Sequence, residues 1–235
     1  SLRWYKNMIG DCSADVVSST VPCSTKWMVG TVNSFYIGII ATVIATALGT
    51  LAALGLSRPH MPYKGLIMAI LISPMIVPLI ITAAGMFFFY ARINLVYTFT
   101  GVILAHVALA TPFVVITVTA TLVGFDMNMV KAAQSLGAKP MRTFFKVIMP
   151  LILPGIISGA LFAFITSFDE VVVVMFMASI DQLTIPKQMW AGIRQEISPV
   201  ILCMATCLVV LSIVLLTTVE LLRRRSEKLR GIKAR

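Results

Sequence analysis

The chain has few charged residues for its length. Only 12% of its 235 residues are charged, 59% are hydrophobic, and the mean hydropathy is +0.97. A soluble domain carries about twice that charged fraction. The composition therefore excludes an ordinary soluble domain and predicts an all-α integral membrane protein, whose apolar surface faces lipid and other helices.

Residues for catalysis and metal binding are also scarce. There are two histidines, and no nucleophile and base can be paired from the sequence, so no catalytic residue is predicted. The four cysteines lack the flanking ligands of a zinc site, so no metal site is predicted. The phosphate-binding pattern Gly-x-x-x-x-Gly-Lys is absent. The chain cannot hydrolyse ATP unaided, and any energy it uses must come from a partner protein.

Acidic residues are outnumbered, which gives a net charge of +10. Such a charge can indicate nucleic-acid binding, but here the charges cluster at the ends of apolar runs, as the positive-inside rule expects. We therefore expect membrane lipid, and no nucleic acid, as the partner of these charges.

Five apolar segments are each long enough to cross a bilayer as a helix. We expect a transmembrane domain at residues 29–222, with spans at about 32–56, 65–90, 101–123, 147–168 and 199–222. Pro74 and Pro78 lie in the middle of the second span and should kink it. Two interpretations stay open for the kink, an irregularity of packing or a lining of a transport pathway.

Small residues and one histidine stand out within the spans. Gly49 and Gly55 in the first span, and Gly155 and Gly159 in the fourth, favour close packing of helices. His106 is ionisable at membrane depth, where such a group faces the bundle interior or water. We favour a neutral histidine hydrogen-bonded to a neighbouring helix, and a pathway residue is the alternative.

The stretch from Lys131 to Pro150 is a short basic, amphipathic segment between the third and fourth spans, in a loop expected at 124–146. Gly137 can adopt a positive φ, which would end a helix and turn the chain. Pro150 stands where the next membrane helix is expected to start. Asp126 could cap the helix that begins the segment.

Two adjacent acids, Asp169 and Glu170, end the fourth span. In a helix they would point about 100 degrees apart, so one could face a pathway while the other caps or pairs elsewhere. A solvated helix end is the alternative. Residues 171–179 are apolar but too short to cross a bilayer, which indicates a re-entrant or buried piece. A short helix is expected around 187–196. The candidate translocation residues are Asp169, Glu170, Phe168, His106 and Trp190.

The distribution of basic residues predicts the orientation. Thirteen of the 19 Lys and Arg residues lie on one side of a five-span chain, in the loops after the first and third spans and in the tail at 223–235. That side should be cytoplasmic, with the C-terminus, and residues 1–28 should be periplasmic. This assigns Lys131 to the cytoplasm and Asp169 to the external side.

The N-terminal segment carries a second open question. Cys12 and Cys23 fit either a disulfide in an oxidising compartment or two free thiols. No basic start followed by an apolar core is present, so no secretory signal peptide is expected. Three aromatic residues are candidate interfacial anchors: Trp4, Tyr5 and Trp27.

The spacing in KAAQSLGAKPMRTFFKVIMP resembles the signature of ABC-importer permeases. Four positions are identical to it, Ala132, Ala133, Gly137 and Pro150, and two are conservative, Val147 and Met149. Lys131 departs, since that family usually has Glu there. The resemblance implies a coupling helix that docks into a groove of a cytoplasmic ATPase. The implied coupling residues are Lys131, Ala132, Ala133, Ser135, Leu136, Gly137, Ala138 and Pro150. An ordinary basic loop is the alternative.

SFDEVVVV, at 167–174, resembles a segment of the spermidine/putrescine permease family, and the likeness covers nearly the whole chain except about residues 9–28. It implies the fold of a type I ABC importer transmembrane domain in the bacterial inner membrane. The implied solute is a polyamine, although relatives in that family carry opines or amino-acid derivatives. The opening SLRWYKNM is similar to the stretch after a first membrane helix, so a preceding helix is expected.

The resemblance also implies partners. These are a second permease subunit, two ATPase subunits that bind the ATP and Mg, and a periplasmic solute-binding protein; this chain itself is expected to bind no cofactor. Two other hypotheses stand beside it. A secondary transporter or channel would work alone, but apart from His106 the span interiors lack ionisable residues. A membrane-bound enzyme would use His106 and Asp169, which lie on different spans.

Overall fold

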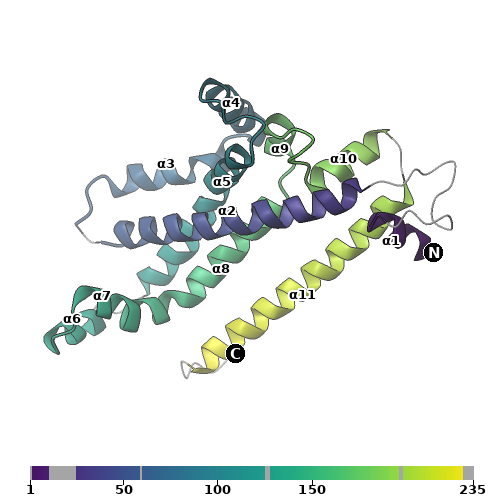
Figure 1. The fold of residues 1–235 in the computed structure, drawn as a ribbon. Coiled ribbons are helices and arrows are strands. Elements are labelled where there is room, and N and C mark those ends of the chain that lie inside the picture. The colour runs from purple at the N-terminus through teal and green to yellow at the C-terminus, as the bar shows by residue number, and fades with distance from the viewer. Residues whose placement is uncertain (1, 11–24, 59, 125–127, 196–197, 230–235) are drawn as a thin grey trace. The chain divides into compact units, whose positions relative to one another are not determined.

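A computed structural model describes residues 2–10, 25–58, 60–124, 128–195 and 198–229. These residues form helices joined by short connections, and no strand occurs within these ranges (Figure 1). Cys12, Cys23 and Asp126 lie outside them, so the disulfide and the helix cap suggested for these residues stay predictions.

The helices follow one another with few long connections. In chain order they are α1 (Leu2–Met8), α2 (Lys26–Leu56), α3 (Lys64–Ile76), α4 (Leu79–Arg92), α5 (Phe99–Val123), α6 (Asn128–Ser135), α7 (Pro140–Thr143), the π-helical turn η1 (Phe144–Ile148), α8 (Met149–Phe168), α9 (Val172–Met177), α10 (Ile185–Gln195) and α11 (Pro199–Leu229). Among the described residues, four helical stretches are long and apolar enough to cross a membrane, or up to five if α3 and α4 form one span. The four are Lys26–Leu56, Phe99–Val123, Pro140–Phe168 and Pro199–Thr217.

The stretch expected as one kinked second span contains a sharp break. α3 and α4 meet at a bend of 103°. Val77, between them, is extended (φ −71°, ψ 135°), the conformation that steric contact with a following proline favours, and Pro78 follows. Pro74 is accommodated inside α3. Pro78 therefore accounts for the break. α3 and α4 together form either a broken span or a re-entrant loop.

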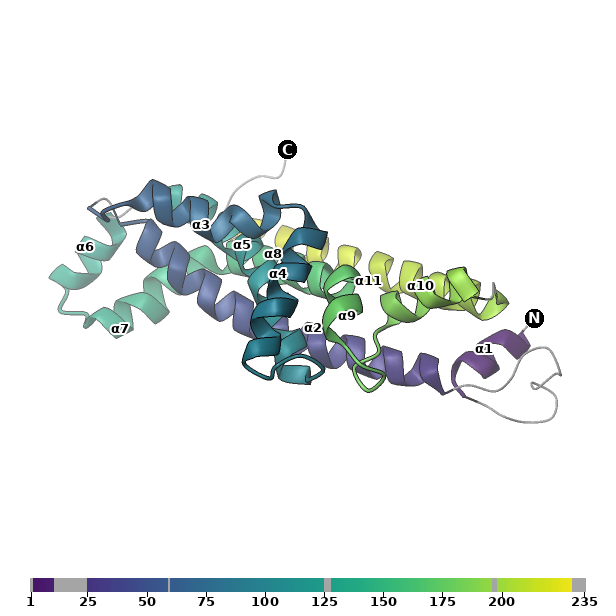
Figure 2. The ribbon, with the colours of Figure 1, turned by 90° about the horizontal axis from the view of Figure 1, so that it is seen from above.

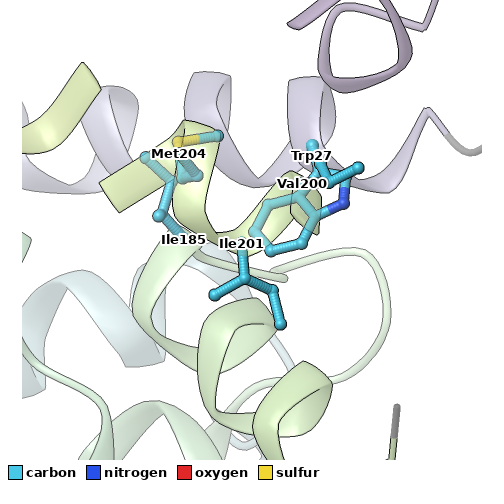
Figure 3. Packing of buried hydrophobic residues seen from close by; sticks show 5 residues of the cluster. All are labelled: Trp27, Ile185, Val200, Ile201 and Met204. Atoms are coloured by element: carbon cyan, nitrogen blue, oxygen red, sulfur yellow. The ribbon is translucent and has the colours of Figure 1, made fainter. Parts of the chain in front are cut away.

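The chain divides into two compact units, and the first contains Ser1–Ile37, Ala83–Val102 and Phe168–Arg235. Its core is a cluster contributed by α2, α10 and α11: Trp27, Ile185, Val200, Ile201 and Met204 (Figure 3). Trp4 and Phe168 pack against it, and α1 packs on α11. Trp27 is 7% exposed. It is therefore a core residue, and its expected role as an interfacial anchor is wrong.

In this unit the connection from α9 to α10 is fastened to α2 by two polar side chains. The Asn33 amide nitrogen donates to the carbonyls of Asp181 at 2.8 Å and Leu183 at 2.9 Å. The Ser34 hydroxyl oxygen accepts from the Ile185 amide at 2.9 Å, at the start of α10. Both side chains are buried. The polar connection is thus held in place by residues of an otherwise apolar helix.

Asn33→Ala should destabilise this unit. The change removes the donors to two partly buried carbonyls, and each such hydrogen bond contributes about 0.5–1.5 kcal/mol. We expect a lower thermal unfolding midpoint in detergent. Thr31→Ala is the control on the same helix, because its hydroxyl bonds only to the Trp27 carbonyl one turn earlier. Equal midpoints for the two variants would contradict this fastening role.

The second unit contains Gly38–Thr82 and Ile103–Ser167. Its helices approach each other at glycines. A Cβ at Gly49 of α2 would lie 2.6 Å from the Val114 Cβ of α5, and a Cβ at Gly159 of α8 would lie 3.0 Å from the Val114 Cα. A Cβ at Gly155 would overlap the Thr121 hydroxyl. The expected close packing is confirmed at these three glycines, but not at Gly55, which has nothing within 4 Å of an added Cβ.

Candidate coupling and translocation site

The segment expected to couple the chain to an ATPase folds as a short helix with a defined stop. α6 ends at Ser135, and Gly137 has a φ of +78°. The Gly137 amide donates to the Gln134 carbonyl at 2.9 Å, and the Ala138 amide donates to the Ala133 carbonyl at 3.0 Å. These two bonds form a Schellman motif, in which glycine takes the left-handed position. The conformation expected for Gly137 is therefore confirmed.

The surface of this segment is open and partly apolar. Leu136 is 89% exposed and Met141 is 71% exposed, while Val130 on α6 is buried. Ala132 is exposed, and a Cβ on Gly137 would meet nothing within 4 Å. α6 and α7 contact each other and lie side by side beyond one end of α8 in both views (Figures 1 and 2). Exposed apolar side chains grouped with small residues are typical of a surface that another protein covers.

The remaining coupling residues lie on or directly after this segment. Lys131 and Ser135 are exposed on α6, and the Ser135 hydroxyl donates to the Lys131 carbonyl at 3.0 Å. Ala133 and Ala138 are half-buried. Because α6 and the turn after it supply all of them except Pro150, the structure brings the predicted coupling residues together in one short stretch.

The fourth span was expected to start near Pro150, but it starts ten residues earlier, at Pro140. The helical stretch begins at Pro140 and continues through η1 into α8, in which Pro150 is the second residue. Proline lacks the amide that would bond to the carbonyl four residues earlier, at Lys146. The π-helical turn Phe144–Ile148 lies at this point, where the hydrogen-bond pattern must change.

The two acids directly follow the end of the fourth span, as was expected, and lie in a break between two helices. α8 ends at Phe168 and α9 begins at Val172. The Glu170 carboxylate accepts a hydrogen bond from the Val173 amide at 2.8 Å and is 7% exposed, whereas Asp169 is exposed. Glu170 therefore takes the capping role that was expected of one acid, and the pathway role expected of the other stays a prediction.

Burial raises the pKa of the Glu170 carboxyl, and the charge of Asp169 raises it further, although hydrogen bonds from the amides of Val173, Val172 and Val171 act in the opposite direction. The net direction is upward. A carboxyl with a raised pKa keeps its proton in the folded state at a pH where the unfolded chain has lost it.

The stability of the wild-type chain should therefore fall as the pH rises through this window. Between the unfolded and the folded pKa the folded state binds more protons, so the free energy of unfolding decreases with pH. Glu170→Gln can still accept from Val173 but cannot ionise, so it should flatten the fall of the thermal midpoint as the pH rises above the ordinary glutamate pKa of about 4.3. Asp169→Asn removes only the smaller contribution of the neighbouring charge, so it should reduce the slope without abolishing it. A slope unchanged in Glu170→Gln would contradict this assignment.

The other candidate pathway residues are held by neighbours. His106 of α5 is 1% exposed, and its Nδ1 lies 2.7 Å from the Ser167 hydroxyl of α8, so the favoured hydrogen bond to a neighbouring helix is confirmed. The Phe168 ring meets Phe35 edge to face at 5.2 Å. Trp190 is 44% exposed, with the Arg194 guanidinium 5.3 Å from its ring centroid. The structure does not assign these residues to one site.

A hollow of about 700 Å³ lies in the first unit beside α10. Two lysines line it, Lys26 and Lys187, and the Lys187 ammonium donates to the Ala178 carbonyl at 2.7 Å. Burial lowers the pKa of Lys187. Because positive side chains repel a cation, this hollow is unsuited to a cationic solute. Asp169 is the better candidate for such a contact.

Sequence reasoning missed the residues that connect helices through polar side chains. Ser167 was noted only as the first residue of SFDEVVVV, and Asn33 and Ser34 only fell within the first expected span. The available signal was their polarity at membrane depth, which normally requires a hydrogen-bond partner. Among the described residues no group of three or more His, Cys, Asp or Glu could hold a metal ion.

Helices able to cross a membrane, and a connecting segment with exposed apolar and small residues, fit the membrane-embedded subunit of a transporter. Three comparisons agree with this class. The family model described as "Binding-protein-dependent transport system inner membrane component" matches residues 25–228. A chain of the MetNI methionine ABC transporter, solved in inward-facing conformations, has the same fold, with a TM-score of 0.64 and 19% identity over 93% of this chain and 100% of that one.

Two curated relatives come from bacterial polyamine systems. The spermidine/putrescine transport system permease protein PotC of Haemophilus influenzae is 31% identical, covering 83% of this chain and 76% of that protein. The putrescine transport system permease protein PotI of Escherichia coli is 28% identical, covering 88% and 71%. The chain belongs to the family of binding-protein-dependent transport system inner membrane components. The expected fold, that of an ABC importer transmembrane domain, is confirmed.

Proposed function

We propose that this chain is a permease subunit through which a polyamine crosses the bacterial inner membrane in an ATP-driven importer. A second permease subunit would complete the passage, two ATPase subunits would bind ATP and Mg and hydrolyse the nucleotide, and a periplasmic binding protein would deliver the solute. The N-terminus of the chain would be periplasmic and its C-terminus cytoplasmic. The chain itself would carry out no catalysis.

The observation that carries this proposal is the exposed segment around Gly137. It combines a helix stopped at Ser135 with an open apolar side chain at Leu136 and no bulk at Gly137. The charge distribution along the sequence supports a cytoplasmic location for this segment. A partner that pushes on α6 and α7 acts directly on α5 and α8, because those two helices flank the segment in the chain.

The solute class rests on two supports. PotC and PotI, whose names specify spermidine and putrescine, are similar to this chain over more than four fifths of its length. Asp169 offers an exposed carboxylate after α8, and a carboxylate attracts a cationic amine. An opine or another amino-acid derivative is the alternative solute, and it carries carboxylates that Asp169 would repel.

Uptake by the complete complex in proteoliposomes tests the proposal. We expect ATP-dependent accumulation of radiolabelled spermidine in the presence of the binding protein, inhibited by unlabelled putrescine and not by octopine. Inhibition by octopine without inhibition by putrescine would replace the polyamine assignment. Accumulation by the isolated chain, without ATP, would overturn the assignment to an ATP-driven importer.

Leu136→Asp should release the ATPase subunits. Placing a charge in the centre of a covered apolar contact should reduce the ATPase recovered with the affinity-tagged complex about tenfold or more. Ile180→Asp is the matched control, because Ile180 is 85% exposed but lies between α9 and α10. Equal ATPase recovery with Leu136→Asp and wild type would show that this residue is not part of the contact.

A further inference from the structure

α5 and α8 run antiparallel and contact each other along most of their length. As the contact moves along α8 from Gly155 to Ser167, it moves back along α5 from Thr121 to His106. Between these ends the rings of Phe113 and Phe162 stack with centroids 6.3 Å apart. The two helices that flank the coupling segment therefore form a continuous pair within the second unit.

The half of the pair nearer the coupling segment is joined by small groups. Gly155 and Gly159, one turn apart, face Thr121 and Thr117, also one turn apart. The threonine hydroxyls donate within their own helix, Thr121 to the Thr117 carbonyl and Thr117 to the Phe113 carbonyl, both at 2.9 Å. Their bonds are satisfied inside α5, so this contact is one of close packing alone.

The far half of the pair is joined by one buried hydrogen bond. His106 is 1% exposed and Ser167 is 4% exposed, with 2.7 Å between Nδ1 and the hydroxyl oxygen. Within the described part of the chain His106 Nε2 has no hydrogen-bond partner. A buried N–H without an acceptor costs more than an unpaired lone pair. This favours the tautomer in which Nδ1–H donates to the Ser167 oxygen.

The His106–Ser167 bond lies at the C-terminal end of α8. Ser167 is the second-last residue of α8, and Asp169, the exposed acid, follows two residues later. We propose that His106 is a positioning residue: its bond to Ser167 holds the far end of α8 to α5, so that the pair moves as one body. A displacement of α6 and α7 then reaches Ser167, two residues before Asp169 in the chain. This inference rests on the proposed function for its transport consequence.

The ratio of solute moved to ATP hydrolysed tests the transport consequence. In the reconstituted complex with spermidine, Ser167→Ala should lower this ratio about three- to tenfold, the range expected when a coupling element is weakened. The double variant His106→Leu with Ser167→Ala removes both polar groups and leaves none unpaired. Ser167→Ala alone leaves His106 Nδ1 unpaired and should lower the thermal midpoint of unfolding. The double variant should regain the wild-type midpoint, but its ratio of solute moved to ATP hydrolysed should stay low. Thr206→Ala, which removes an exposed hydroxyl bonded only within α11, should leave the ratio unchanged.

Two outcomes would overturn the positioning role. One is a wild-type ratio in Ser167→Ala. The other is a wild-type ratio in the double variant, since this would show that the bond only satisfies two buried polar groups.

Spin labels test the same role without any solute. In a cysteine-free chain within the complex, one label pair replaces Leu104 and Ile165, exposed residues near the far end of α5 and α8. A second pair replaces Ile116 and Leu153, exposed residues near the glycine contacts. Ser167→Ala should broaden the distance distribution of the first pair and leave that of the second unchanged.

An unchanged first pair would refute the positioning role directly. If the wild-type complex moves no spermidine while the first pair still broadens in Ser167→Ala, the polyamine assignment fails and the positioning role stands. The two proposals can therefore fail separately.

Discussion

Gly137→Pro should abolish solute uptake while the chain still inserts into the membrane. Gly137 has a φ of +78°, and proline is restricted to about −65°, so the turn after α6 cannot form. Proline also removes the amide that donates to the Gln134 carbonyl. Gly137 lies between the candidate spans Phe99–Val123 and Pro140–Phe168, so the spans should be unaffected. Uptake of radiolabelled spermidine, with membrane content measured by immunoblot, checks the expectation.

Gly137→Asn is the matched control. Asparagine tolerates the left-handed conformation better than other residues with a side chain, and a Cβ at this position meets nothing within 4 Å. Most uptake should remain in this variant. Normal uptake in Gly137→Pro would count against the coupling role of the segment, and equal loss in both variants would show that bulk, not backbone conformation, is what the contact excludes.

The backbone conformation around Gly137 was predictable because its determinants are local. A glycine that must adopt positive φ, small residues on one short helix and flanking basic residues all lie within about twenty positions of one another in the sequence. The Schellman motif needs only Ala133, Gln134, Gly137 and Ala138. Local geometry of this kind depends little on the rest of the fold, so the residue types alone were informative.

The partners of polar side chains could not be predicted, because they come from distant parts of the chain. His106 bonds to Ser167, and Asn33 bonds to the carbonyls of Asp181 and Leu183. The sequence required a partner for a histidine at membrane depth but did not say which one. The fourth span was predicted to end at Phe168, as it does, but two adjacent acids in the sequence did not show that Glu170 would accept a hydrogen bond from the Val173 amide.

Some prolines bend the chain and others do not, because the effect of each depends on its tertiary surroundings. Pro78 stands at a bend of 103°, whereas Pro74 and Pro154 are inside helices and Pro150 follows a π-helical turn. Each proline removes one backbone donor, but whether the chain bends depends on what satisfies the freed carbonyl. The sequence therefore predicted a kink in the second span but not the angle of the bend.

Gly155→Leu should prevent the second unit from folding. Even a Cβ at this position would overlap the Thr121 hydroxyl and lie 2.9 Å from the Thr121 Cβ, and both helices present backbone or short side chains there. Gly155→Ala should already lower the free energy of unfolding by about 1–3 kcal/mol, the usual cost of overpacking. Leucine adds three more carbons, so little folded chain should be recovered in a monodisperse gel-filtration peak in detergent.

Gly85→Leu separates this steric effect from any general intolerance of a large side chain. Gly85 lies inside α4 with nothing within 4 Å of an added Cβ, and leucine favours a helix over glycine by up to about 1 kcal/mol. This variant should give a normal peak. Thr121→Ala should partly rescue Gly155→Ala, because it removes the nearest overlapping atom. Full recovery of Gly155→Leu would mean that α5 and α8 do not meet at this register, and the positioning of Ser167 by His106 would lose its structural basis.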